Sequence, residues 1–282
     1  MIVTAKGKTH AGRRRLKNET DYGLEDVFWV ICDGGMAGGS RGDVASQLAV
    51  DAIRHRLSPK RRGQDEIPLI LHESIQAAQS RLLEEGRRDP KKYGMRTLAI
   101  VAALCRDRLF FANVGSSRGY ISRAGRFVQM TRDDTLLQNI MEAGELTAEE
   151  AESHSARDVI TQAVGAKGGI KVSLTYAELR CGDVLFLCSP GLTAMVREPE
   201  IARILADNKN DPQMACDVLV DRANAAGGED DITVIVAKFE GEDLPPPSPG
   251  DIAALARQTY VLPLEASSGP ATVDLRRSAT SS

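Results

Sequence analysis

Apolar and polar positions in the first third of the chain predict one buried strand followed by two helices. Residues 27–32 form a short apolar run that ends at Asp33, which two glycines follow. Such a run before a turn is typical of a buried strand that carries an acid at its end. Beyond the turn, apolar residues recur at helical spacing over residues 41–57, and a second helix is expected over residues 67–85.

The rest of the chain consists of further blocks of strands and helices. Short polar turns separate a first group of expected strands, at residues 98–105, 109–114, 118–122 and 127–130. Two acid-rich helices should follow, at residues 136–143 and 147–152, the second begun by a capping box of Thr147 and Glu150. The last expected elements are strands at residues 171–176, 184–188 and 232–239 and a helix at 212–226. These blocks predict an α+β fold, because a parallel sheet would require strict alternation of strands and helices.

The composition favours one large domain with a tail. The chain has 282 residues, 42% of them hydrophobic, which is enough to bury a sizeable core, and no clear linker precedes residue 240. From residue 241 the composition changes, because prolines at 245–249 break any regular element and residues 267–282 are rich in small polar side chains. We expect a domain over residues 1–240 and a flexible tail over 241–282, with one short helix near 252–260.

Charge and cysteine content argue against several classes of protein. The 36 basic residues are offset by 39 acidic ones, so the chain lacks the basic surface of a nucleic-acid-binding protein. Five cysteines form no CxxC pair, which suits a reducing compartment better than a disulfide scaffold. The N-terminus lacks a signal-peptide pattern and no apolar run reaches membrane-spanning length. We expect a cytoplasmic protein that binds neither nucleic acid nor a membrane.

Five short motifs hold the residues that suit metal and phosphate binding. In chain order they are residues 12–20 (GRRRLKNET), 33–35 (DGG), 115–118 (GSSR), 189–193 (SPGLT) and 228–233 (GEDDIT). Their order and context resemble the PPM (PP2C-type) metal-dependent serine/threonine phosphatases, whose corresponding segments read G-x-x-R-x-x-N-E-D, D-G-M-G-G, G-D-S-R, S-D-G-L-T and G-G-x-D-N-I-T. The resemblance runs from Thr9 to Phe239. It implies an α-β-β-α sandwich, in which helices flank two antiparallel sheets packed face to face.

The resemblance also implies roles for four residues. Asp33 stands where the family has the aspartate that bridges two metal ions, and Gly34 where a backbone carbonyl serves the second ion. Asp230 matches the family's last metal-binding aspartate, and Arg15 matches its phosphate-binding arginine, whose guanidinium can hold two phosphate oxygens at once. Taken alone, Asp33 reads as a turn after a strand and Arg15 as part of a solvated basic run. Their occurrence in the expected order favours the family's roles.

Several positions lack the carboxylate that the resemblance implies. Pro190 replaces the aspartate of S-D-G, Ser116 that of G-D-S-R, and Thr20 the last one of N-E-D, while Ala194 stands where some members carry a further acid. The family's third metal site should therefore be absent. Hard cations such as Mg²⁺ and Mn²⁺ prefer oxygen ligands, and only two expected carboxylates remain. We expect weak binding of Mg or Mn, as a single ion or not at all.

These departures predict a phosphatase-like protein with an incomplete metal centre and impaired catalysis, that is, a pseudophosphatase. It would act by binding a phosphoprotein or a partner from a kinase pathway. Two other hypotheses stay open. The first is an active Mg- or Mn-dependent phosphoserine and phosphothreonine phosphatase with a reduced metal site, and the second is a regulatory domain whose tail recruits another protein. The sequence predicts no oligomeric state.

Overall fold

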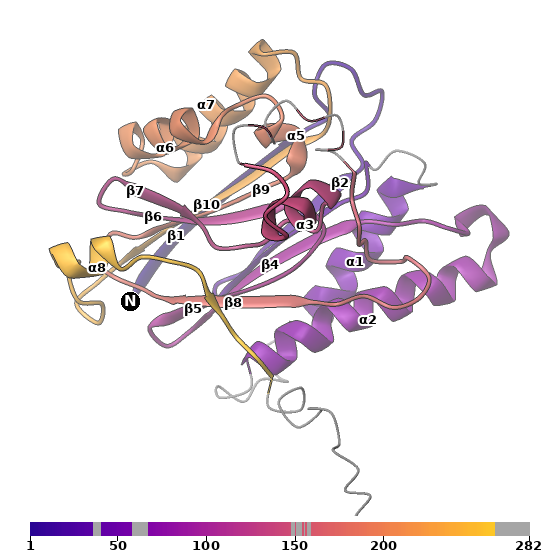
Figure 1. The fold of residues 1–282 in the computed structure, drawn as a ribbon, viewed down its shortest axis with the longest axis horizontal. Helices are drawn as coiled ribbons and strands as arrows, with labels where there is room; N and C mark the ends of the chain where they lie inside the picture. Colours follow the sequence, from indigo (N-terminus) through magenta and orange to yellow (C-terminus); the bar gives the residue numbers. More distant parts are fainter. Residues whose placement is uncertain are drawn as a thin grey trace, which may run out of the picture.

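Two antiparallel sheets lie face to face at the centre of the molecule, and helices cover their outer faces (Figure 1). The structure is a computed structural model that describes residues 1–35, 41–57, 67–147, 150, 154, 156 and 159–262. This arrangement confirms the predicted α+β fold and the sandwich that the resemblance implies.

Eleven strands in the described residues build the two sheets. The first sheet has the order β1 (Ile2–His10), β10 (Ile232–Glu240), β9 (Val184–Cys188), β6 (Arg118–Arg123) and β7 (Arg126–Gln129). The second has the order β11 (Gln258–Thr259), β8 (Ser173–Glu178), β5 (Arg108–Val114), β4 (Leu98–Cys105), β3 (Phe28–Asp33) and β2 (Thr20–Leu24). Antiparallel pairing throughout allows short turns between neighbours such as β4 and β5.

The helices divide between the two outer faces. On the second sheet lie α1 (Gly42–Leu57) and α2 (Ile67–Arg88), which pack on each other and on β2 to β5. On the first sheet lie α5 (Pro190–Thr193), α6 (Glu198–Asp207) and α7 (Pro212–Ala225), and α7 covers β1 and β10. The short elements η3 (Pro90–Lys92), α3 (Leu136–Glu142) and α8 (Pro249–Ala253) lie in connections.

Alternation along each central strand separates three hydrophobic layers. In β3, Trp29 and Ile31 point into the core between the sheets, where Trp29 packs edge-on against Phe239 with ring centroids 5.7 Å apart. Val30 and Cys32 of the same strand point to the layer under α1 and α2. A third layer lies under α6 and α7. Because both faces of β3 are buried, its sequence is apolar without interruption, and the strand holds Asp33 rigidly at its end.

Among the described elements, β1, β2 and α6 lack a counterpart in the sequence prediction, and so do the short elements η3, α5 and β11. Strand β1 contains Lys6, Gly7 and Lys8 and alternates between exposed and half-buried positions, so its apolar pattern is weak. It pairs with β10 over all nine residues, and this distant pairing stabilises it as a strand. The expected helix at 147–152 lies mostly outside the described residues, although Thr147 and Glu150 form the reciprocal bonds of a capping box.

The segment expected as a tail begins at residue 241. Its described part, up to Leu262, runs along the sandwich, adds β11 to the edge of β8, and buries Leu244, Leu255 and Leu262 against the core. Tyr260 stacks edge-on against Phe110 with ring centroids 5.6 Å apart. The predicted division at residue 240 stays a prediction, and residues 263–282 lie outside the described residues.

Among the described helices, none combines the length with the apolarity that a membrane span requires. All five cysteines are free thiols, and three of them are buried.

Candidate functional site

The predicted site residues Asp33, Arg15 and Asp230 come together at one end of the sandwich. Asp33 is the last residue of β3 and is only 5% exposed. Its Oδ1 accepts hydrogen bonds from the Thr20 hydroxyl at 3.2 Å and from the Gly35 amide at 2.9 Å. Burial, followed by the nearby charges of Asp230 and Asp231, raises the pKa of Asp33 to about 7. This carboxylate is therefore held in place by two uncharged donors.

Gly34 makes a backbone contact that only glycine allows. A Cβ atom built on Gly34 would overlap the Gly42 carbonyl at the start of α1, and a Cβ on Gly42 would overlap the Gly34 carbonyl oxygen. The Gly34 amide also donates to the Glu19 carbonyl at 3.1 Å. The carbonyl that the resemblance assigns to a second metal ion therefore lies against the first turn of α1.

Arg15 has a different environment from its two basic neighbours in the sequence. Arg13 and Arg14 are exposed, whereas Arg15 is half-buried and its Nε donates to Asp230 Oδ1 at 2.8 Å. A terminal nitrogen of Arg15 also donates to the Gly35 carbonyl. The hydrogen bond to Asp230 is the main cause of a raised Arg15 pKa, so the guanidinium stays charged. Arg15, which is predicted to bind phosphate, thus forms an ion pair with Asp230, which is predicted to bind metal.

Asp231 is a member of the site that the sequence analysis did not single out. Its side chain is fully buried, and its Oδ2 accepts the Glu19 amide at 2.7 Å. Its Oδ1 has no hydrogen-bond partner within the described part of the chain. Burial, opposed by the bond from Glu19, raises the Asp231 pKa to about 6. The signal was available in the sequence, because Asp231 occupies the position of the asparagine in G-G-x-D-N-I-T.

The segment around Pro190 is fixed against the start of β10. Ser189 Oγ donates to the Asp231 carbonyl at 2.9 Å and accepts the Thr233 amide at 3.0 Å. Pro190 then begins α5, where its missing N–H is tolerated because the first helical N–H groups have no partner in the helix. The fold motif is thus intact, and the side chain at position 190 offers no oxygen to a cation.

The motif at residues 115–118 belongs to a separate polar cluster. Arg118 pairs with Asp133 at 2.7 Å and with Glu198 at 3.3 Å, and the Gly115 amide donates to Asp134 Oδ2 at 2.9 Å. Attraction to Asp133 and Tyr120 outweighs burial and raises the pKa of Arg118. No hydrogen bond or ion pair in the described residues joins Arg118 to Asp33, Arg15 or Asp230. Arg118 instead ties the start of β6 to Asp133, which follows β7, and to Glu198 of α6.

The donor set has the oxygen chemistry that a hard divalent cation prefers. Asp33, Asp230 and Asp231 gather around Gly35, and a buried carboxylate oxygen without a donor is satisfied by a cation. Yet within the described ranges no three acidic, His or Cys side chains are arranged to hold a metal by themselves. Backbone carbonyls, water or phosphate oxygens would have to complete the coordination shell.

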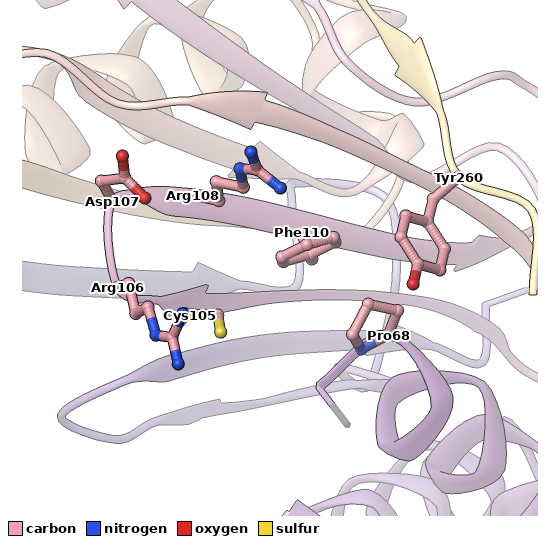
Figure 2. A pocket seen from close by; sticks show the side chains of 7 residues that line it. All are labelled: Pro68, Cys105, Arg106, Asp107, Arg108, Phe110 and Tyr260. Carbon is pink, nitrogen blue, oxygen red and sulfur yellow. The ribbon is translucent and has the colours of Figure 1, made fainter. Parts of the chain in front are cut away.

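A pocket away from the candidate site lies between the β4–β5 turn, the start of α2 and the C-terminal segment (Figure 2). Its volume is about 280 Å³, and its lining residues are Pro68, Cys105, Arg106, Asp107, Arg108, Phe110 and Tyr260. Figure 2 shows Tyr260 opposite Pro68, so the C-terminal segment forms one wall. The lining shares no residue with the candidate site.

Comparisons with known proteins give one family of relatives. The chain is 32% identical over 240 residues to the serine/threonine phosphatase Stp of Listeria monocytogenes, covering 83% of this chain and 95% of that protein. It is 32% identical over 239 residues to the phosphatase PstP of Mycobacterium tuberculosis, covering 84% of this chain and 45% of that protein. A search of family models found no match.

Solved structures agree with the sequence relatives. The crystal structure of the M. tuberculosis phosphatase PstP/Ppp superimposes with a TM-score of 0.79 at 30% identity, covering 86% of this chain and all of that one. The catalytic domain of PstP in complex with two manganese ions gives a TM-score of 0.74 at 29% identity, covering 85% of this chain and 99% of that one.

Proposed function

Because the chain belongs to the PPM (PP2C-type) family of serine/threonine phosphatases, we propose that it is a member with an incomplete metal centre and impaired catalysis. It holds at most one Mg²⁺ or Mn²⁺ ion, and weakly. Its role is to bind a phosphoprotein or a protein of a kinase pathway through the phosphate-binding end of the sandwich.

The observation that carries this proposal is the loss of carboxylates in an intact framework. Ser189 and Gly191 pack against the segment that leads into β10, while the side chain of Pro190 between them offers no oxygen. Ser116 has a hydroxyl at a second position where a carboxylate is expected. A fold that keeps its framework but lacks these metal ligands supports the binding of a phosphorylated partner more than the hydrolysis of its phosphate.

The arrangement of Arg15 supports the same conclusion. When bound, a divalent cation supplies charge that stabilises the transferring phosphoryl group and lowers the pKa of a bound water. Arg15 recognises phosphate oxygens, but here its Nε and a terminal nitrogen already bond Asp230 and Gly35. A phosphate must replace at least one of these bonds and approach three carboxylates. We infer that phosphate binding is modest unless a cation offsets this negative charge.

A second candidate function is that of an active phosphatase with a reduced metal site. The relatives favour it, since they are named serine/threonine phosphatases and one solved relative holds two manganese ions. Asp33, Asp230 and Arg15 are all in place in this chain.

Phosphate release separates the two candidates. A phosphoserine or phosphothreonine peptide is incubated with the purified chain and Mn²⁺, with and without a chelator. The proposed function predicts release near background in both. Chelator-sensitive release at ordinary enzymatic rates, about 1 per second or faster, would establish the active phosphatase instead.

Binding is tested on the same peptide by calorimetry, with its unphosphorylated form as control. We expect the phosphorylated form to bind more tightly, and Arg15→Ala to remove the difference. Equal affinity for both forms would contradict phosphate recognition by this site.

A further inference from the structure

Two departures from the family's motifs lie on neighbouring segments in this fold. The chain has lost a carboxylate at Pro190 and gained one at Asp231, where the family's motif has asparagine. A Cβ atom built on Gly191 would overlap the Asp231 carbonyl, and Ser189 Oγ donates to that same oxygen at 2.9 Å. The lost and the gained carboxylate therefore belong to segments that pack on each other.

The side chain of Asp231 has an unused oxygen. Asp183, which is equally buried, shows how this fold normally satisfies an acid, because Arg123 donates to both of its oxygens, at 2.9 and 2.7 Å. Asp231 Oδ2 accepts one amide, whereas Oδ1 has no donor among the described residues. A buried acceptor without a partner destabilises the fold, and no contact among the described residues gives this second carboxylate oxygen a structural use.

The Asp231 carboxylate also lies close to Asp230 and Gly35. A Cβ atom on Gly35 would lie 3.3 Å from Asp231 Oδ2 and 3.2 Å from Asp230 Oδ1. The amide of Gly35 donates to Asp33 at 2.9 Å. Asp231 therefore borders the same small volume as the two acids that the resemblance assigns to metal.

We propose that Asp231 is a ligand of the divalent cation in this chain and takes over the role of the carboxylate missing at position 190. The inference rests on the single-cation centre of the proposed function. It explains why the chain carries an acid at a position where an amide would satisfy the fold without adding a buried charge.

The first test is a calorimetric titration with Mn²⁺ alone. Asp231→Asn is isosteric and introduces the family's own residue, so it preserves the fold, which circular dichroism verifies. We expect its Mn²⁺ affinity to fall at least tenfold relative to wild type. The matched control is Asp217→Asn. It removes a carboxylate on α7 that pairs with Lys8 of β1, and it should change the affinity less than twofold.

The second test shows whether the side chain reaches the ion. A thiolate prefers soft Cd²⁺ to Mn²⁺, so Asp231→Cys should lose Mn²⁺ affinity and gain at least tenfold in Cd²⁺ affinity over wild type, with a new thiolate-to-cadmium absorption band. The wild-type titration with Cd²⁺ accounts for the five native thiols.

Each result has one meaning. Mn²⁺ affinity unchanged in Asp231→Asn overturns the assignment of Asp231 and leaves the single-cation centre standing. Loss of Mn²⁺ without gain of Cd²⁺ in Asp231→Cys also overturns it, because the residue then acts only through its neighbours. Absence of Mn²⁺ binding by the wild-type chain overturns the single-cation centre itself, and the assignment falls with it.

Discussion

At the scale of single residues, the site holds two acids that are placed where water cannot solvate them. Asp33 and Asp231 are buried, and Arg15, which bonds Asp230, is a cation whose charge acts on Asp231. Their raised pKa values, about 7 and about 6, have burial as the main cause. The chain keeps these acids although they destabilise the fold at neutral pH, which is typical of residues kept for binding.

A pH-dependent stability follows from Asp33. In the unfolded chain its pKa returns to about its ordinary value of 3.8. Between about pH 4 and 7 the folded state therefore binds the extra proton, and the free energy of unfolding falls as pH rises through this range. In chelator at pH 8, Asp33→Asn should be more stable than wild type, by on the order of 2–4 kcal/mol.

Denaturant unfolding at pH 5 and pH 8 measures this effect. The advantage of Asp33→Asn should shrink at pH 5, where the wild-type acid is mostly protonated. Asp43→Asn is the control with opposite sign, because Lys17 lowers the Asp43 pKa and its charge stabilises the fold. A variant Asp33→Asn less stable than wild type at pH 8 would show that the buried charge is compensated.

Restoring the missing carboxylates tests whether their loss limits catalysis. The double variant Pro190→Asp with Ser116→Asp should raise Mn²⁺-dependent hydrolysis of an aryl phosphate at least tenfold, about 1.4 kcal/mol of barrier. Its matched control is Pro190→Asn with Ser116→Asn, which releases the same backbone constraint without adding charge. Equal gains in both variants would assign the effect to backbone freedom.

At the scale of elements, the C-terminal segment packs like part of the domain. Leu255 is 3% exposed in the core between the sheets, and the Tyr260 amide donates to the Leu174 carbonyl at 2.9 Å. The prolines at residues 245–249 predicted a tail because they prevent a regular helix or strand. Composition does not show whether a distant apolar surface of the fold binds the segment. The exposed edge of β8 and the core beneath it give this segment its structure.

Core truncation in this segment measures how firmly it is docked. Leu255→Ala should lower the free energy of unfolding by about 2–4 kcal/mol, through lost burial and the cavity that remains. Val261→Ala, at a position 58% exposed, should change it by less than about 0.5 kcal/mol. If both variants match wild type, the segment detaches easily and the domain ends near residue 240, as composition predicted.

At the scale of the whole molecule, the site joins the two sheets. Asp33 ends β3 of one sheet, while Asp230 and Asp231 precede β10 of the other. The bond between Arg15 and Asp230 spans 215 residues of sequence. Local patterns predicted the central strands, because burial on both faces is a local property. The resemblance supplied four candidate site residues through short motifs, and their roles stay predictions. Local patterns did not predict that β1 forms a strand or that Asp231 lies in the site, since both depend on partners more than 200 residues away.

This architecture predicts that folding does not require a metal ion. Three hydrophobic layers and the buried pair of Arg123 and Asp183 hold the sandwich together away from the site. Followed by the fluorescence of Trp29, which is fully buried, cooperative unfolding should have the same midpoint with and without chelator in metal-free buffer. Added Mn²⁺ at ten times its dissociation constant should stabilise the fold by only about 1.4 kcal/mol, the amount that mass action gives for one site. Asp33→Asn should lose this increment and still unfold cooperatively. A midpoint that drops steeply in chelator would instead show a tightly bound structural ion, contrary to a single weak site.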